Sequence, residues 1–122
     1  MELPKTLPPK VEPIVRAAIE SVEEVAPQAT EIPYKMGRPQ SKSMMWKLVR
    51  YAVDGKNVVG IGTFTAHSAM FFYRGRELDD GNGLLQGSGK DTRFVTLRTP
   101  AEASSAKVKA LLRKAFKLGP AG

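Results

Sequence analysis

The 122-residue chain contains no cysteine and only one histidine, His67. The missing thiols exclude disulfides, thiolate zinc sites and cysteine nucleophiles. A single imidazole also excludes a metal site built from paired histidines. Most enzyme classes that short motifs identify are thereby excluded. No catalytic residue is predicted, although one histidine and many carboxylates are sufficient for acid–base chemistry.

A long apolar segment is also missing. The apolar runs are only a few residues long, whereas a helix needs roughly 18 apolar residues to span a bilayer. Residues 1–10 have no apolar core of the kind found in signal peptides. The composition, with 42% hydrophobic and 25% charged residues, is that of one soluble domain. We expect a cytoplasmic protein without membrane contacts.

Charged side chains are present but unevenly distributed, and the net charge is +7. Residues 1–34 hold three basic and six acidic side chains, whereas residues 35–56 hold six and one, and residues 101–122 hold five and one. A basic surface favours anionic partners such as acidic metabolites or nucleic acid, but it also serves solubility alone.

Two segments have the apolar periodicity of amphipathic helices. The first begins at Pro13, which suits a first helical turn, and ends before Pro27. The second ends at Gly119, and more than one residue could begin it. Thr99 begins a capping box with proline after it, and Ser104 or Ser105 could cap a shorter helix.

Between these helices the sequence has β character. Short runs at 30–34 and 93–98 flank three consecutive strands at 44–53, 57–65 and 68–74. Asp54-Gly55 predicts a tight hairpin between the first two of these three strands. The pattern predicts an α+β fold, in which an antiparallel meander with one or two further strands packs against N- and C-terminal helices.

The domain boundaries follow from the same pattern. Residues 1–12 are predicted to be a flexible N-terminal arm because prolines interrupt them, residues 13–118 a single domain, and residues 119–122 a C-terminal tail. Gly60 and Gly62 share one face of the middle strand, where a helix or another backbone could approach closely.

A glycine-rich segment, residues 77–90, precedes the last predicted strand. It is not a nucleotide-binding P-loop, because five residues separate Gly83 from Gly89 and Asp91 replaces the required Ser or Thr. Backbone amides and two nearby cations could still hold an anion. A structural turn with solvated charges is the alternative. The candidate ligands are Gly87, Ser88, Gly89, Lys90 and Arg93.

His67 lies at a strand junction beside Ser68. Adjacent strand residues point to opposite faces, so these two do not form a nucleophile–base pair. His67 is either a hydrogen-bonded structural residue or a ligand contact. We place it with Arg74 in the same predicted anion site as the glycine-rich segment.

Two charged helix faces allow other interpretations. Glu20, Glu23 and Glu24 share a face of the first helix, where they could weakly hold a hard cation or simply be solvated. The C-terminal helix could contact phosphates, but single-strand binding normally adds base-stacking aromatics. The aromatic residues are expected in the sheet, where alternate ones are core. The basic side chains of the C-terminal helix are Lys107, Lys109, Arg113, Lys114 and Lys117.

The centre of the chain carries an extended pattern. Val59 to Phe64 and then His67 lead to Leu78-Asp79-Asp80, and Gly87, Gly89, Lys90 and Arg93 close it. This pattern resembles that of the YdhG-like family, a domain of unknown function, over about residues 14–117. The resemblance implies a small α+β fold with some likeness to frataxin. It also implies, from one branch of the family, an intracellular iron chaperone that serves iron–sulfur assembly.

Three functions are thus predicted in order of preference. The first is a non-enzymatic domain that binds an anionic small molecule at the glycine-rich segment and needs no cofactor. The second is iron delivery through Glu20, Glu23 and Glu24. The third is non-specific nucleic-acid contact through the basic C-terminal helix. The sequence predicts no oligomeric state.

Overall fold

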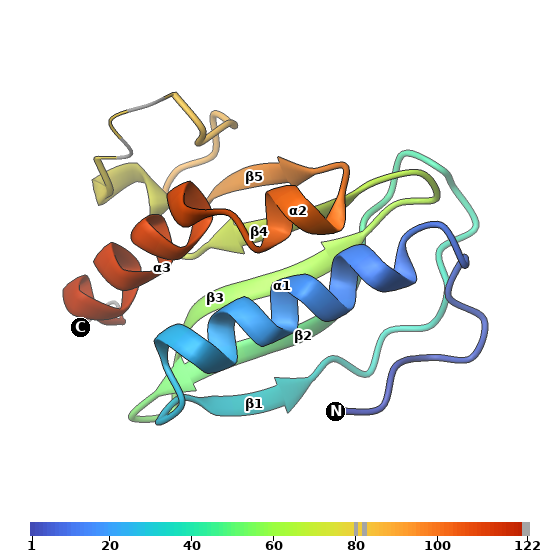
Figure 1. The fold of residues 1–122 in the computed structure, drawn as a ribbon, viewed down its shortest axis with the longest axis horizontal. Helices are drawn as coiled ribbons and strands as arrows, with labels where there is room; N and C mark the ends of the chain where they lie inside the picture. Colours follow the sequence, from blue (N-terminus) through green and yellow to red (C-terminus); the bar gives the residue numbers. More distant parts are fainter. Residues whose placement is uncertain (80, 82, 121–122) are drawn as a thin grey trace.

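The computed structural model describes residues 1–79, 81 and 83–120. Five antiparallel strands form one sheet in the order β1-β2-β3-β4-β5, and the three α-helices lie on one face of it (Figure 1). The predicted α+β fold is confirmed. The elements are α1 (Glu12–Val25), β1 (Thr30–Pro33), β2 (Trp46–Val53), β3 (Lys56–Thr63), β4 (Ser68–Phe72), a 3-10 turn η1 (Gly75–Glu77), β5 (Arg93–Leu97), α2 (Pro100–Ala103) and α3 (Ala106–Leu118).

The turns and caps follow local chemistry. Asp54 and Gly55 both have positive φ, 53° and 77°, as the predicted tight hairpin between β2 and β3 requires. Two of the three candidate caps at the C-terminal end, Thr99 and Ser105, are used. The Thr99 hydroxyl accepts from the Glu102 amide to begin α2, and Ser105 accepts from the Val108 amide to begin α3. The predicted C-terminal helix is therefore two helices.

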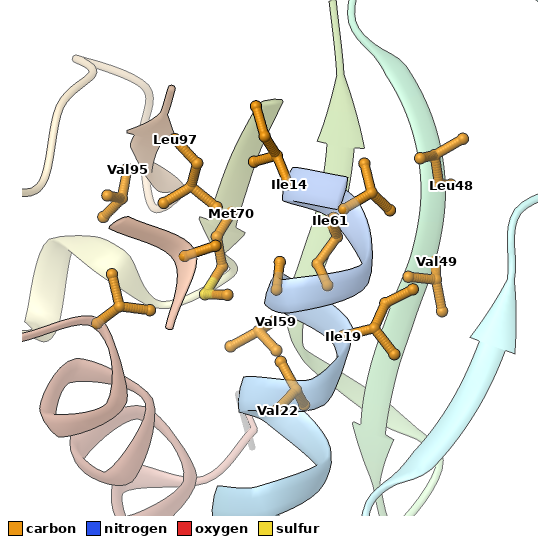
Figure 2. Packing of buried hydrophobic residues seen from close by; sticks show 14 of the residues in the cluster. Ile14, Ile19, Val22, Leu48, Val49, Val59, Ile61, Met70, Val95 and Leu97 are labelled. Carbon is orange, nitrogen blue, oxygen red and sulfur yellow. The ribbon is translucent and has the colours of Figure 1, made fainter. Parts of the chain in front are cut away.

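The core lies between the sheet and the helices. Figure 2 shows apolar side chains of α1 facing those of the central strands. Alternate strand residues point to opposite faces, so the core takes every second residue of β4 and β5. In β3 it takes Val59 and Ile61, and Val58 in addition. The labelled side chains are Ile14, Ile19, Val22, Leu48, Val49, Val59, Ile61, Met70, Val95 and Leu97.

The N-terminal segment differs from the predicted flexible arm, because it packs onto the domain. Leu3 and Leu7 are only 7% and 6% exposed, and Val11 is fully buried. Backbone bonds from the Leu7 amide to Pro4 O and from the Val11 amide to Pro8 O form successive turns. The prolines shape these turns, and the four-residue spacing of the apolar side chains aims all three at the core.

The glycines of β3 are covered by side chains and not by a helix. A Cβ on Gly60 would lie 2.2 Å from the ring of Phe71, and one on Gly62 would lie 2.5 Å from the sulfur of Met45. The space over these glycines is therefore filled by a side chain of β4 and by that of Met45, the residue before β2. In the described part of the chain, no helix combines the length and apolar character needed to cross a bilayer.

Candidate functional site

The strand register separates the residues of the predicted anion site. His67 immediately precedes β4, whose first residue Ser68 pairs with Leu97. Arg93 pairs with Phe72 at the other end of β4, and Arg74 follows that same end. The structure therefore brings Arg74 and Arg93 to one end of the sheet and places His67 at the opposite end.

Arg74 is occupied by bonds within the protein. Its Nε and Nη2 donate to the two carboxylate oxygens of Glu77 at 2.6 and 2.7 Å. Its Nη1 donates to three carbonyl oxygens at the end of α3, those of Leu118, Gly119 and Pro120. The hydrogen bond from Arg74 lowers the pKa of the Glu77 carboxyl. This arginine therefore fastens the C-terminal helix end to the turn after β4.

Arg93 is turned back onto the glycine-rich segment. Its Nη1 donates to the carbonyl oxygens of Gly89 at 2.5 Å and of Thr92 at 2.9 Å. An anion beside this guanidinium would meet carbonyl oxygens, which repel it. The other candidates, Gly87, Ser88, Gly89 and Lys90, are exposed. The carbonyl oxygens of residues 89 and 92 therefore face the arginine side chain.

A small hollow with an enclosed volume of about 30 Å³ lies at the other end of the sheet, beside Phe64, on which His67 stacks. The loop between β1 and β2 forms one side of it, and the ends of β2 and β3 form the other. The hollow is lined by Pro8, Arg38, Pro39, Ser41, Lys42, Met44, Trp46, Thr63, Phe64 and Thr65.

The lining combines cations with apolar walls. Arg38 and Lys42 are exposed at the hollow. Among the residues that the structure describes, neither forms an ion pair with a carboxylate, and no described lining residue is acidic. Trp46 is 6% exposed, and its Nε1 donates to Met36 O at 3.1 Å. That bond fixes the indole and ties the loop to β2.

His67 supports one wall of this hollow. Its ring stacks on Phe64, with the ring centroids 4.7 Å apart and the planes at 26°. The neighbouring polar groups are satisfied, because Thr63 Oγ1 lies 2.9 Å from Ser68 Oγ. Of the residues predicted for the anion site, His67 alone lies next to the hollow.

The acidic face of α1 does not gather its carboxylates. Glu20, Glu23 and Glu24 are all exposed. Glu24 Oε2 lies 2.9 Å from Lys109 Nζ, and this hydrogen bond lowers the pKa of the Glu24 carboxyl. Across residues 1–79, 81 and 83–120, no three His, Cys, Asp or Glu side chains are grouped as a metal site. The iron alternative gains no support from this face.

The basic face of α3 is partly used for packing. Lys109 pairs with Glu24, and Lys114 Nζ donates to Asp79 O at 2.8 Å. Lys107, Arg113 and Lys117 are exposed, and Lys114 is exposed too despite its bond to Asp79.

Comparisons of the chain with protein-family models, with curated proteins and with solved structures find no match. The resemblance to the YdhG-like family stays a prediction, as does the iron-chaperone role that it implies.

Proposed function

We propose that this chain is a non-enzymatic binding domain for a small anionic molecule that also has an apolar part. The site is the hollow beside Trp46. The observation that supports it is the presence of two cations, Arg38 and Lys42, over apolar walls that include no described acidic residue. The anionic ligand predicted from the sequence is thus retained, but its site moves to the opposite end of the sheet.

Both parts of the ligand have a matching group. A guanidinium binds a phosphate or carboxylate through two parallel hydrogen bonds, and a lysine ammonium adds a point charge. Phe64 offers aromatic surface to the apolar part, with a small contribution from Trp46, which is 6% exposed. Met44, on the rim, exposes 56% of its surface, and a bound ligand would cover part of it. About 30 Å³ of the hollow is enclosed, much less than the roughly 300–1,000 Å³ of ligand clefts, so most of a bound ligand would lie over the rim.

The structure gives less support to the other two predicted sites, the glycine-rich segment and the acidic face of α1. Lys90 is exposed, but the glycine-rich segment beside it directs carbonyl oxygens at Arg93. Iron on the face of α1 would compete with Lys109 for Glu24. At the hollow, Arg38 and Lys42 form no ion pair with any described residue that a ligand would have to break.

Calorimetry with phenyl phosphate tests the site. Wild-type protein should bind phenyl phosphate, and inorganic phosphate should bind about tenfold more weakly because it buries no ring. Lys42→Gln and Arg38→Gln should each weaken phenyl phosphate binding about tenfold, since each removes a charge-assisted hydrogen bond.

Lys90→Gln is the matched control, because it removes the same charge from the glycine-rich segment. It should bind phenyl phosphate like the wild type. Weakened binding in Lys90→Gln with unchanged binding in the other two variants would return the site to the glycine-rich segment. If neither ligand gives a heat of binding with the wild-type protein, the proposal is refuted.

A further inference from the structure

The sheet face opposite the helices carries a row of aromatic and basic side chains. The register aligns Arg50 of β2, Gly60 of β3, Phe71 of β4 and Phe94 of β5 across four strands. Their neighbours along each strand, such as Val59 and Phe72, lie in the core with the helices. Since all three α-helices lie on the other side (Figure 1), no helix covers this row.

Five of these side chains form one contiguous cluster, which we call the aromatic–cation cluster: Tyr34, Lys47, Arg50, Phe71 and Tyr73. The Lys47 ammonium lies 5.8 Å from the ring centroids of both Tyr34 and Phe71, and the Arg50 guanidinium lies 4.8 Å from that of Tyr34. The rings of Phe71 and Tyr73 are 5.7 Å apart. The hydroxyls of Tyr34 and Tyr73 are hydrogen-bonded to each other. The contacts join three strands.

Because Gly60 has no side chain, the ring of Phe71 can lie close to the backbone in the middle of this face. Phe71 lies against Gly60, where a side chain would push the ring away from the sheet. Phe71 is 5% exposed, whereas Tyr34, Tyr73 and Phe94 are each half-buried. The buried ring of Phe71 therefore fills the middle of the face, and the rings with more exposed surface lie around it.

The charge on this face has one sign. Lys47 and Arg50 lie in the cluster, and Arg98 continues the alternation of Phe94 and Thr96 along β5. Glu31 belongs to the other side, because its carboxylate accepts from the buried Tyr51 hydroxyl. On this face, the strand positions that the structure describes hold no carboxylate. The face therefore complements a polyanion.

We propose that this face binds single-stranded nucleic acid, independently of the anion hollow. Unpaired bases stack on sheet aromatics while basic side chains contact the backbone phosphates. Lys47 and Arg50, which cover the Tyr34 ring, move to the phosphates and leave the ring to a base. This movement gives up three cation–π contacts. Each is worth less than one base stack, and the phosphate contacts that Lys47 and Arg50 gain offset the rest. A duplex does not fit, because its bases are stacked inside the helix.

Fluorescence anisotropy with labelled oligouridine, oligothymidine and a duplex tests this proposal. Both single strands should bind at least about tenfold more tightly than the duplex. With three cations at roughly 0.7 per phosphate, log K should fall with log salt at a slope of about −2. Oligouridine and oligothymidine should bind alike, since neither a ring nor a cation recognises the 2′-hydroxyl. Binding of the duplex alone, or of one single strand alone, would overturn the proposal.

Two sets of variants locate the contact. Lys47→Gln/Arg50→Gln should weaken single-strand binding by at least about tenfold and bring the slope close to about −0.7. Lys107→Gln/Lys117→Gln removes the same charge from α3, on the other side of the sheet, and should bind like the wild type. An equal loss in both pairs would overturn the proposal and favour contact without a defined face.

Stacking is tested separately from charge. Tyr34→Leu should weaken binding about tenfold without changing the salt slope. Tyr73→Phe, which keeps the ring and loses only the hydroxyl, should retain binding. Thermal melts followed by circular dichroism establish that each variant is folded. Should a folded Tyr34→Leu protein bind like the wild type, stacking is refuted and the proposal with it.

Discussion

The ring of Phe71 in β4 lies directly against the backbone of Gly60 in β3. An added Cβ on Gly60 would stand 2.2 Å from Phe71 Cε2 and 2.3 Å from Cζ. Phe71 is also 5% exposed, so the ring has little room to move. The glycine and the phenylalanine therefore form one packing unit on the face opposite the helices.

Gly60→Ala should destabilise the protein by about 1–3 kcal/mol, the usual cost of overpacking. The free energy of unfolding from urea titrations measures it. Gly37→Ala is the control, because nothing lies within 4 Å of a Cβ at that position, and it should stay within about 0.5 kcal/mol of the wild type. Equal stability of Gly60→Ala and wild type would show that Phe71 does not rest on this glycine.

Ser21→Ala should lower the free energy of unfolding by about 1–3 kcal/mol, because it leaves a buried carbonyl without its donor. Ser21 Oγ donates to Ala103 O at 2.7 Å and thereby links α1 to α2. Ser104→Ala, which removes an exposed hydroxyl bonded within α2, should have an effect below about 0.5 kcal/mol. Equal effects of the two substitutions would contradict the role of this link.

Stability should fall above pH of about 10, where tyrosine ionises in the unfolded chain. Burial, together with the hydrogen bond to Glu31, raises the pKa of Tyr51, and burial also raises the pKa of Tyr73. The folded protein holds these protons while the unfolded chain releases them. The contribution of these tyrosines to the free energy of unfolding is therefore fully present below that pH. Above it, the free energy of unfolding declines by about 1.4 kcal/mol per pH unit for each tyrosine.

Tyr51→Phe should remove the share of this decline that belongs to Tyr51. Urea titrations at several alkaline pH values give the slope of stability against pH for both proteins. Lysine titrations contribute equally to the two slopes, so the difference isolates Tyr51. Identical slopes would mean that Tyr51 is not held protonated by folding.

The sequence predicted the fold because alternation and caps are local signals. Asp54-Gly55 predicted the hairpin, and the predicted caps Thr99 and Ser105 each begin a helix. The prolines of the N-terminal segment predicted a flexible arm, and they gave no sign that Leu3, Leu7 and Val11 would be buried. Proline restricts a backbone without preventing it from packing.

The grouping of the site residues was less predictable. His67 immediately precedes β4 and Arg93 is the first residue of β5. The starts of antiparallel neighbours lie at opposite ends, so the register of β4 and β5 separates the two residues. That inference was available once the strands were assigned. The hollow itself depends on how the loop before Trp46 folds back. Its only sequence signal was the excess of basic residues at 35–56.

Trp46 provides the most direct test of the anion hollow, because it is the only tryptophan in the chain and lines the site. Titration with phenyl phosphate should change its fluorescence saturably, in the wild type and in Lys90→Gln alike. In Lys42→Gln the titration midpoint should rise about tenfold. A wild-type signal that stays flat, or a midpoint that Lys42→Gln and Arg38→Gln leave unchanged, would contradict a ligand site at this end of the sheet.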